Sequence, residues 1–575
     1  HTPVNVYREL IRMHRRDGLD FAHVVTFNLD EYWPMQPDAL QSYVRCMREN
    51  FHDHVNIPDE NVHIPDGTVP EAQLADYCRD YERKIRDAGG IDFQLLGIGR
   101  TGHIGFNEPG SPRDSRTRRV RLDRVTRLDA ASDFFGEENV PDWAISMGVG
   151  TILEARAIAL LAFGEHKAPV LRRTVEEPVS GQVAASFLQE HPDATIYADT
   201  AAAAALTRFA TPWKVQRCTW DTRMTRKAVA WLSGKAGKAI LSLRDEDYDE
   251  NGLHQLLMER GGAYNANLEV FKGLMNTITG WPGGKTPPRR VVVFSPHPDD
   301  DVICMGATLQ KLCAQGHEVH CAYQTSGNLA VFDHDVMRFA DFVREFDRIF
   351  GLAADQTHLI DEHIEQFLRH KPPAAMDSRE VQAVKTLIRR TEAIAAASFC
   401  GVSRENCHFL DMPFYRTGVV QKRPIEQADV DIVADLLRRV RPEMVFAAGD
   451  LSDPHGTHRM CLQAVREALD ACAGELEAPR LWLYRGAWQE WEPHEIDMAV
   501  PVSPDELHHK RHAIFRHESQ KDRAMFPGPY DSREFWQRAE ERNRNTAATY
   551  DALGLPEYHG IEAFVRWRRD LKDHA

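Results

Sequence analysis

Short apolar runs rich in β-branched residues alternate with helical patterns over two long stretches of this 575-residue chain. In the first stretch, four such runs predict buried strands at 24–27, 93–96, 157–161 and 194–197. Near-continuous apolar strands separated by helices are typical of a parallel sheet that helices cover on both faces. The alternation therefore predicts an α/β domain over residues 1–210.

The same alternation returns in the C-terminal half of the chain. We expect strands there at 290–295, 318–324, 407–411, 443–448 and 481–485. Residues 211–288 carry mostly helical patterns and end in 280–288, a run of glycines and prolines that breaks helices and strands. The predicted fold class is α/β, with two Rossmann-like parallel-sheet domains, 1–210 and 289–575, joined by a mostly helical bridge over 211–288.

Composition excludes several classes of function. The formal net charge of −16 argues against a nucleic-acid partner, because phosphate binding calls for a basic surface. No apolar run approaches the ~20 residues that cross a bilayer, so we expect no membrane association. The ten cysteines form no C-x-x-C pair, which argues against a disulfide framework and a thiolate zinc site. We predict a cytoplasmic enzyme acting on small molecules.

One histidine and three carboxylates lie within five residues, His297 to Asp301, directly after the predicted strand 290–295. Ligands in open α/β sheets bind at the carboxyl ends of strands, and a divalent cation would relieve the repulsion among these carboxylates. A second histidine pair, His455 and His458, follows the predicted strand 443–448 and could complete a three-ligand zinc site with an open position for water. The alternative is a helix N-terminus with acidic capping residues. The second pair makes that alternative the weaker interpretation.

Over roughly residues 289–570 the sequence resembles the LmbE/PIG-L-type N-acetylglucosaminyl deacetylases, whose signature is a strand, His-Pro-Asp-Asp and a distant His-x-x-His. The resemblance implies that His297, Asp300 and His458 bind one Zn²⁺. It implies that Asp299 is the general base for the attacking water. It also implies that His455 faces the amide oxygen and steadies the tetrahedral intermediate.

The same resemblance leaves some points open. Thr457 stands where the family often has Asp, which bears on the orientation of His455, and Arg389 to Glu392 resembles a structural or substrate-side element. A His-Asp-His donor set suits zinc best but also accepts iron or cobalt. The substrate could be a free, phosphorylated, nucleotide-linked or conjugated N-acetyl sugar.

Two segments of the first domain carry further candidate residues. Residues 27–32 place Asp30 and Glu31 at the end of a predicted strand, and residues 97–109 form a glycine-rich loop in which His103 and Glu108 offer an acid/base pair. The loop lacks the third glycine of a dinucleotide fingerprint. Each segment alone could equally be an ordinary tight turn.

Together these segments resemble glucosamine-6-phosphate deaminase across nearly all of residues 1–210. The resemblance implies that Asp30 moves a proton between sugar carbons 1 and 2, that His103 opens the ring and that Glu108 supports His103. Lys167 would contact the sugar phosphate.

Thr2 and Glu31 are also assigned to substrate binding by this resemblance. Thr2-Pro3 resembles the tail of a phosphate-binding loop, so we expect an upstream segment. Two residues depart from the family: Thr101 replaces an Asp near the catalytic histidine, and Asp133 replaces a phosphate-binding Arg. The seven arginines in 113–127 could substitute for that Arg, or they could form a solvated or subunit-facing surface.

The leading hypothesis is a fused deacetylase and deaminase, assembled as a homo-oligomer and acting on an amino sugar or sugar phosphate. A second hypothesis makes the first domain a non-catalytic sugar-phosphate sensor or an oligomerisation module. A third, a lactonase-like hydrolase on the same scaffold, is disfavoured by the paired acids in 27–32.

Overall fold

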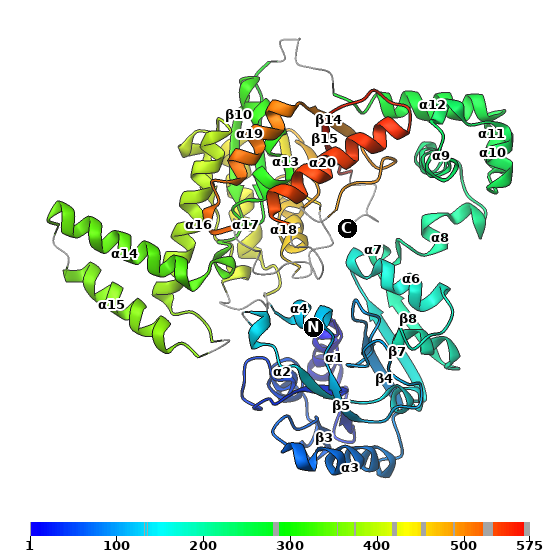
Figure 1. Cartoon of the computed structure of the whole chain (residues 1–575), viewed down its shortest axis with the longest axis vertical. Helices are drawn as coiled ribbons and strands as arrows, with labels where there is room; N and C mark the ends of the chain where they lie inside the picture. The colour runs from blue at the N-terminus through cyan, green and yellow to red at the C-terminus, as the bar shows by residue number, and fades with distance from the viewer. Residues whose placement is uncertain are drawn as a thin grey trace. The chain divides into compact units, whose positions relative to one another are not determined.

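The computed structural model forms two compact units, the first ending at Ala210 and the second beginning at Thr211 (Figure 1). The residues that the structure describes are 2–131, 133–134, 136–279, 287–352, 355–372, 375–416, 423–449, 456–486, 489–520 and 533–568, without the side chains of 355–357.

Four parallel strands of the first unit overlap the predicted runs, and a further parallel strand was not predicted. Of the four, β4 (Phe93–Gly97), β7 (Ala157–Ala162) and β8 (Ala194–Ala198) form a parallel sheet in the order β4-β7-β8, and β1 (Thr26–Phe27) pairs in parallel with the unpredicted strand β3 (Val62–His63). A second, antiparallel sheet was not predicted. It has the order β2-β6-β5 and consists of β2 (Asp30–Trp33), β6 (Trp143–Ser146) and β5 (Arg118–Arg121).

Helices cover the parallel sheet of the first unit through apolar stripes. In α3 (Leu74–Asp87), Leu74, Cys78, Tyr81 and Ile85 recur at helical spacing and are buried, and the helix ends before two glycines. Tyr81 and Ile85 share a core with residues of β4 and β7. The other helices of this unit are α1 (Val4–Asp17), α2 (Tyr43–Asn50), α4 (Arg124–Ala130), α5 (Val149–Leu153), α6 (Ala168–Glu176), α7 (Thr200–Ala203) and α8 (Thr207–Ala210).

The second unit contains a mixed sheet with the strand order β11-β10-β9-β12-β13-β15-β14. Its strands are β9 (Arg290–Ser295), β10 (Glu318–Tyr323), β11 (Cys407–Phe409), β12 (Met444–Ala448), β13 (Arg480–Tyr484), β14 (Met498–Val502) and β15 (Gly560–Arg566). β9 to β13 are parallel, whereas β15 runs antiparallel to both β13 and β14. β10, the next strand in the sequence, lies on one side of β9 in the sheet, and β12 lies on its other side. The carboxyl ends of β9 and β12 therefore form a topological switch point.

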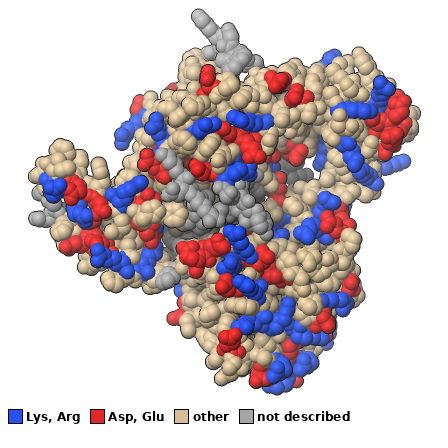
Figure 2. Space-filling view, in the orientation of Figure 1, with Lys and Arg blue, Asp and Glu red and all other residues tan. Residues whose placement is uncertain are grey.

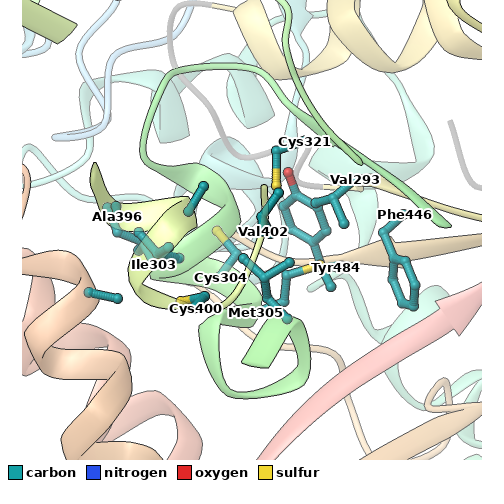
Figure 3. Close-up of a cluster of buried hydrophobic side chains, with 14 of the residues drawn as sticks. Val293, Ile303, Cys304, Met305, Cys321, Ala396, Cys400, Val402, Phe446 and Tyr484 are labelled. Carbon is teal, nitrogen blue, oxygen red and sulfur yellow. The ribbon is translucent and has the colours of Figure 1, made fainter. Parts of the chain in front are cut away.

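Two buried clusters cover the two faces of this sheet. In one, Val293, Cys321 and Phe446 of the strands meet apolar side chains of α13 (Asp300–Ala314) and α16 (Arg379–Phe399), as Figure 3 shows. The other joins the strands to α17 (Gln427–Val440) and α18 (Thr457–Ala471). The remaining helices of the sheet domain are α14 (Asp333–Phe350), α15 (Asp355–His370), α19 (Pro504–Ile514) and α20 (Phe535–Ala552).

The segment predicted as a bridge folds as helices that belong to the second unit. It contains α9 (Thr222–Ala236), α10 (Asp245–Glu250), α11 (His254–Arg260) and α12 (Ala263–Met275). Val229 and Leu274 share a core with Ala499 of β14 and Tyr550 of α20. The apolar faces of these helices are thus buried against the edge of the C-terminal sheet. Of the glycine- and proline-rich run, 280–286 lies outside the described residues.

A buried ion pair links three elements of the second unit. Lys510 Nζ lies 2.7 Å from Glu562 Oε1 and donates to Asn543 Oδ1 at 2.9 Å, and both charged side chains are almost fully buried. Glu562 also accepts hydrogen bonds from the backbone N–H and hydroxyl of Thr308. Removing one partner of a buried pair leaves the other charge uncompensated.

We therefore expect Glu562→Gln to lower the free energy of unfolding by about 3 kcal/mol, measured by urea denaturation. The matched control is Glu345→Gln, which removes the exposed partner of Arg348 and should cost less than about 0.5 kcal/mol. Equal losses in the two variants would contradict a structural role for the buried pair.

Candidate active sites

The first candidate site lies at the switch point of the C-terminal sheet. His297 and Asp300 follow β9 directly, and His458 is the second residue of α18, which follows β12. Asp299 occupies the N-cap position of α13. Two loops about 150 positions apart in the sequence thus deliver their polar side chains to one edge of the sheet, where an α/β sheet places ligands.

The three predicted metal ligands converge. His458 Nε2 lies 3.2 Å from His297 Nδ1 and 3.3 Å from Asp300 Oδ2, and His297 Nδ1 lies 3.3 Å from the same carboxylate oxygen. One ligand atom from each residue lies within 4.8 Å of the other two. Burial opposes ionisation of Asp300, but the two imidazoles outweigh it and lower the pKa of that carboxyl. Two imidazoles and one ionised carboxylate at this spacing fit a Zn²⁺ ion.

A buried arginine holds the neighbouring carboxylate. Arg389 of α16 is almost fully buried, and its Nη2 lies 3.1 Å from Asp299 Oδ1. A side chain at Gly327, in the loop after β10, would collide with its neighbours, because its Cβ would lie 2.8 Å from Pro298 and 3.1 Å from Arg389 Nε. The loop after β9, the loop after β10 and helix α16 are therefore closely packed beside Asp299. The Arg389 guanidinium thus fixes the position of the Asp299 carboxylate beside the three predicted ligands.

Sequence patterns did not single out two further residues at this site. Tyr415, after β11, packs edge-on against the His297 ring at 6.4 Å between centroids. His517 is buried near the charges of Asp299 and Arg389, and burial lowers its pKa to about 3, so the imidazole is neutral. No sequence pattern marks His517, which lies two residues before Ser519, a donor of two hydrogen bonds to Glu392.

His455, the predicted partner of the amide oxygen, lies outside the described residues. Asp301, the third acid of the motif, is placed away from the three ligands. Its carboxylate accepts a hydrogen bond from Tyr323 Oη at 3.0 Å and is almost fully buried. Burial raises the pKa of Asp301 to about 7. This placement indicates a structural role for Asp301.

In the first unit, the glycine-rich loop after β4 holds His103 and Glu108 together. His103 Nδ1 lies 3.1 Å from Glu108 Oε2, and the side chains are mostly buried. Thr101 Oγ1 lies 2.9 Å from His103 Nδ1 and donates to Glu108 Oε2 at 3.0 Å. A Cβ at Gly99 would overlap the His103 ring, so the loop needs glycine there. The Thr101 hydroxyl thus bridges the pair where the resemblance expects a carboxylate.

Asp30 begins β2 beneath the same loop. A Cβ on Gly105 would lie 3.0 Å from Ser146 Oγ and 3.5 Å from Asp30 Oδ2, so the backbone two residues beyond His103 passes over the carboxylate. Gly105 has a φ of +55°, which favours glycine at this close approach. Burial, with a contribution from the charge of Glu31, raises the pKa of Asp30 to about 8.

Glu31 has a different environment from Asp30. Its carboxylate accepts hydrogen bonds from Ser42 Oγ and the Tyr43 backbone N–H, both at 2.8 Å, at the N-terminus of α2. Successive residues of a strand point to opposite faces, and this places Glu31 away from the glycine-rich loop. The placement favours a capping role for Glu31 over the substrate contact that the sequence predicts.

The predicted phosphate contacts lie at the ends of β4 and β7. Thr2 lies beside Gly97, the last residue of β4: a Cβ added to this glycine would lie 3.5 Å from Thr2 Oγ1. Lys167 lies between β7 and α6, where burial lowers its pKa to about 8 and the charges of Asp129 and Arg100 also act on it. Arg100, which also follows β4, is paired with Asp129, its Nε 2.9 Å from Oδ2.

Five of the seven arginines of 113–127 lie within 4.0 Å of local acids. The ion pairs are Arg113–Glu190, Arg116–Glu154, Arg119–Glu71, Arg124–Glu137 and Arg127–Asp142. Arg118 donates to Asn107 and Ser111. These partners favour the interpretation of the segment as a surface strand pair over that of a substitute phosphate site.

Comparison with known families assigns a class to each half of the chain. The profile described as glucosamine-6-phosphate isomerases/6-phosphogluconolactonase matches residues 1–197, and the profile described as GlcNAc-PI de-N-acetylase matches residues 292–469. The first unit is thus a glucosamine-6-phosphate deaminase-like domain, and the second contains a PIG-L deacetylase-like domain.

One relative spans both halves. A protein of Bacteroides thetaiotaomicron described as glucosamine-6-phosphate deaminase-like is 49% identical over 587 residues, covering 99% of this chain and 88% of the relative. The chain belongs to this family of glucosamine-6-phosphate deaminase-like proteins, with a PIG-L-type domain after the deaminase-like one.

Two further relatives match the first half alone. The glucosamine-6-phosphate deaminase of Halothermothrix orenii is 48% identical over 206 residues, covering 36% of this chain and 84% of the relative. A solved structure described as a monomeric glucosamine-6-phosphate deaminase is 40% identical, covers 36% of this chain and 84% of its own, and has a TM-score of 0.35. No described helix has the length and apolar content of a membrane span.

Proposed function

We propose that this chain is a bifunctional amino-sugar enzyme. Its C-terminal site hydrolyses the N-acetyl group of an N-acetylglucosamine-type sugar. Its N-terminal site converts glucosamine-6-phosphate to fructose-6-phosphate and ammonia. Deacetylation frees the amino group of the sugar, and deamination removes that same amino group as ammonia. One sugar can therefore be the substrate of both sites in turn.

The observation that carries the deacetylase half is the convergence of His297, Asp300 and His458 beside the Asp299 carboxylate, which Arg389 contacts. Zn²⁺ held by these three residues would supply a Lewis acid for the acetamide carbonyl and activate water. Asp299, held by Arg389, takes the proton of the attacking water and returns it to the leaving amine. The products are acetate and the free amino sugar.

In the first unit, the partly buried carboxylate of Asp30 moves the proton between sugar carbons 1 and 2. A carboxylate with a raised pKa suits this step, because it can take a proton from carbon near neutral pH and give it back. His103, supported by Glu108 and Thr101, opens the sugar ring. Lys167 provides a cation for the sugar phosphate.

The test is a pair of product assays on the intact protein. N-acetylglucosamine and N-acetylglucosamine-6-phosphate are assayed for acetate, glucosamine-6-phosphate is assayed for ammonia and ketose, and the zinc content is measured. A chelator should abolish acetate release and leave ammonia release intact. Acetate release that survives complete metal removal would refute the metal-dependent mechanism.

A second candidate function for the first unit is sugar-phosphate binding without turnover. Asp133 favours it, because a carboxylate at the position of a phosphate-binding Arg repels phosphate, and so does the replacement of a carboxylate by Thr101. Binding of glucosamine-6-phosphate without ammonia release would support this candidate. Measurable ketose formation would exclude it.

We expect a bell-shaped pH dependence for ammonia release, with kcat/KM greatest near pH 8. Asp30 must lose its proton to act as a base, so the rate rises as pH approaches its pKa of about 8. Lys167 must keep its proton to attract phosphate, so the rate falls above its pKa of about 8. Lys167→Arg keeps the charge at higher pH and should remove the falling limb. A rate that does not change between about pH 6.5 and 9.5 would contradict these assignments.

A further inference from the structure

Helix α13, which carries the proposed metal ligand Asp300, is broken shortly after its first turn. Met305 departs from helical conformation, with a φ of −140° and a ψ of 28°. The break divides the helix into a short first segment, 300–304, and a longer second segment, 306–314. The helix contains no proline, and the other common cause of a sharp break is a side chain that enters the hydrogen-bond ladder.

Two side chains from distant elements enter the ladder at the break. In a regular α-helix the backbone N–H of residue 308 would donate to the carbonyl of residue 304. In α13 the Thr308 N–H donates to Glu562 Oε2 of β15 at 2.7 Å. The Cys304 carbonyl accepts a hydrogen bond from Arg542 Nη2 of α20 at 2.8 Å. A carboxylate and a guanidinium thus bond to the two backbone groups that the break separates.

Glu562 caps the second segment of α13. Its carboxylate also accepts hydrogen bonds from the Ala307 N–H at 3.2 Å and the Thr308 hydroxyl at 2.6 Å, and its ion pair with Lys510 holds it in place. A carboxylate at this position satisfies the first N–H groups of a helix and is favoured by the helix dipole. Gly306 leaves room for the pair, since a Cβ there would lie 3.0 Å from Lys510 Cγ. The second segment therefore has an N-terminus of its own.

Arg542 ties the first segment of α13 to the loop after β13. Its Nη1 donates to the carbonyl of Arg485 at 2.9 Å and to that of Gly486, while its Nη2 donates to the Cys304 carbonyl. A planar guanidinium with several N–H groups can span two segments in this way, and a Lys ammonium lacks this geometry. Its Nε lies 3.4 Å from Glu490 Oε2, which provides a counter-charge.

The charges at the break are unusual in their location. Figure 2 shows Lys, Arg, Asp and Glu side chains spread over the surface of the molecule, where such side chains ordinarily lie. Arg542, Glu562 and Lys510 are instead buried, with 8%, 1% and 1% of their surface exposed. Replacing a buried ion pair by apolar side chains of similar volume is often neutral or stabilising. Stability alone therefore does not explain charged side chains at this position.

The first segment of α13 carries two acids of the candidate metal site. Asp299 is its N-cap and Asp300 its first residue. Because the helix is broken, the second segment does not set the orientation of this turn. The Cys304 carbonyl lies about 6 Å along the helix from Asp300, so a change in its contact with Arg542 shifts the turn that bears the ligand. Metal ligands must be held to within about 0.5 Å of their working geometry.

From these contacts we propose that the break in α13 serves to position the metal centre, and that Arg542 is a positioning residue that fixes the turn bearing Asp299 and Asp300. Arg542 acts through the backbone of this turn and takes no part in the chemistry. The inference rests on the proposed metal-dependent function, because Asp300 is a ligand of that site.

The test measures metal binding by the intact protein without turnover. Metal-free protein is titrated with Zn²⁺ in competition with a chromophoric chelator, and the visible spectrum of the Co²⁺-loaded protein reports the geometry of the ligands. Arg542→Met removes the contacts with all three carbonyls, whereas Arg542→Lys keeps a charge beside Glu490 but cannot span the two segments. We expect each variant to lower the Zn²⁺ affinity about tenfold or more and to change the Co²⁺ spectrum.

Lys311→Met is the matched control. Lys311 lies in the second segment of α13, is 8% exposed like Arg542, and forms an ion pair with Glu506 of α19 at 2.5 Å. Its loss should lower the midpoint of urea unfolding and leave the Zn²⁺ affinity and the Co²⁺ spectrum as in the wild-type chain.

Two outcomes would overturn the inference and leave the metal centre intact. One is wild-type affinity and spectrum in both Arg542 variants. The other is an equal loss of affinity in Lys311→Met, which would show a general effect of destabilisation. A wild-type chain that binds neither Zn²⁺ nor Co²⁺ would instead refute the proposed metal-dependent function, and this inference with it.

Discussion

Replacing Asp299 with Asn is expected to lower kcat for acetate release by about 10²–10⁴-fold. Asn has nearly the same shape and can still accept a hydrogen bond from Arg389, whose Nη2 lies 3.1 Å from Oδ1 in the wild-type chain. It cannot take a proton from water. The three proposed metal ligands are unchanged, so the zinc content should stay at the wild-type level. Acetate release and metal content are measured on the same preparation.

The matched control is Asp301→Asn, two positions along the same motif. With a pKa of about 7, Asp301 is largely protonated at slightly acidic pH, and the neutral Asn replaces a group that bonds to Tyr323. We expect acetate release within about tenfold of wild type for this variant, since its carboxyl moves no proton in the reaction. If both variants lose activity equally, the loss reflects damage to the start of α13, and Asp299 is not identified as the base.

The central parallel strands could be predicted from sequence because helices bury them on both faces, whereas β8, which was expected to be buried, has no buried residue and its Tyr197 is 56% exposed. Val291 to Phe294 of β9 are all fully buried, and a strand in that position needs an unbroken apolar run. The antiparallel strands have no unbroken apolar run that would predict them. β5 is Arg118-Arg119-Val120-Arg121, and β15 contains the buried Glu562. A buried Glu in a strand is stabilised here by its ion pair with Lys510 of α19, and this pair forms only in the folded protein.

The ends of the predicted strands located the site residues of both units. His297 and His458 follow strands that are neighbours in the sheet, although 161 positions separate them in the sequence. Sequence alone gave the order of the strands along the chain but not their order in the sheet. The positions of these ligands after two strands made a shared metal site plausible, and the family resemblance was needed to assign His297, Asp300 and His458 as its ligands.

The family resemblance drew attention to Arg389 to Glu392, but the contact of Arg389 with Asp299 could not be predicted, for the same physical reason. Arg389 reaches Asp299 from α16, and His517 lies after α19 within reach of the charge of Asp299, so both placements depend on how helices far along the chain pack against the sheet. An arginine in a helix pattern is usually solvated. Its burial against a carboxylate becomes visible only in the folded structure.

Replacing Asp30 with Asn is expected to lower kcat for ammonia release from glucosamine-6-phosphate by about 10²–10⁴-fold. The partly buried carboxylate of Asp30, with its pKa raised to about 8, is the proposed carrier of the proton between two sugar carbons, and Asn cannot carry it. Acetate release should not change, because Asp30 and the metal ligands belong to different units of the chain. Both products are measured in one preparation, so each activity serves as the internal control for the other.

Glu31→Gln is the matched control for this position, since the two acids are adjacent but face different surroundings. Loss of the charge that accepts hydrogen bonds from Ser42 and Tyr43 should destabilise the fold by about 1–3 kcal/mol and leave ammonia release by the folded enzyme within about tenfold of wild type. If Glu31→Gln abolishes turnover and Asp30→Asn does not, Glu31 is the proton carrier. If the wild-type chain itself binds glucosamine-6-phosphate and releases no ammonia, Thr101 and Asp133 have converted a deaminase-like site into a binding site, and Asp30→Asn then changes only the affinity.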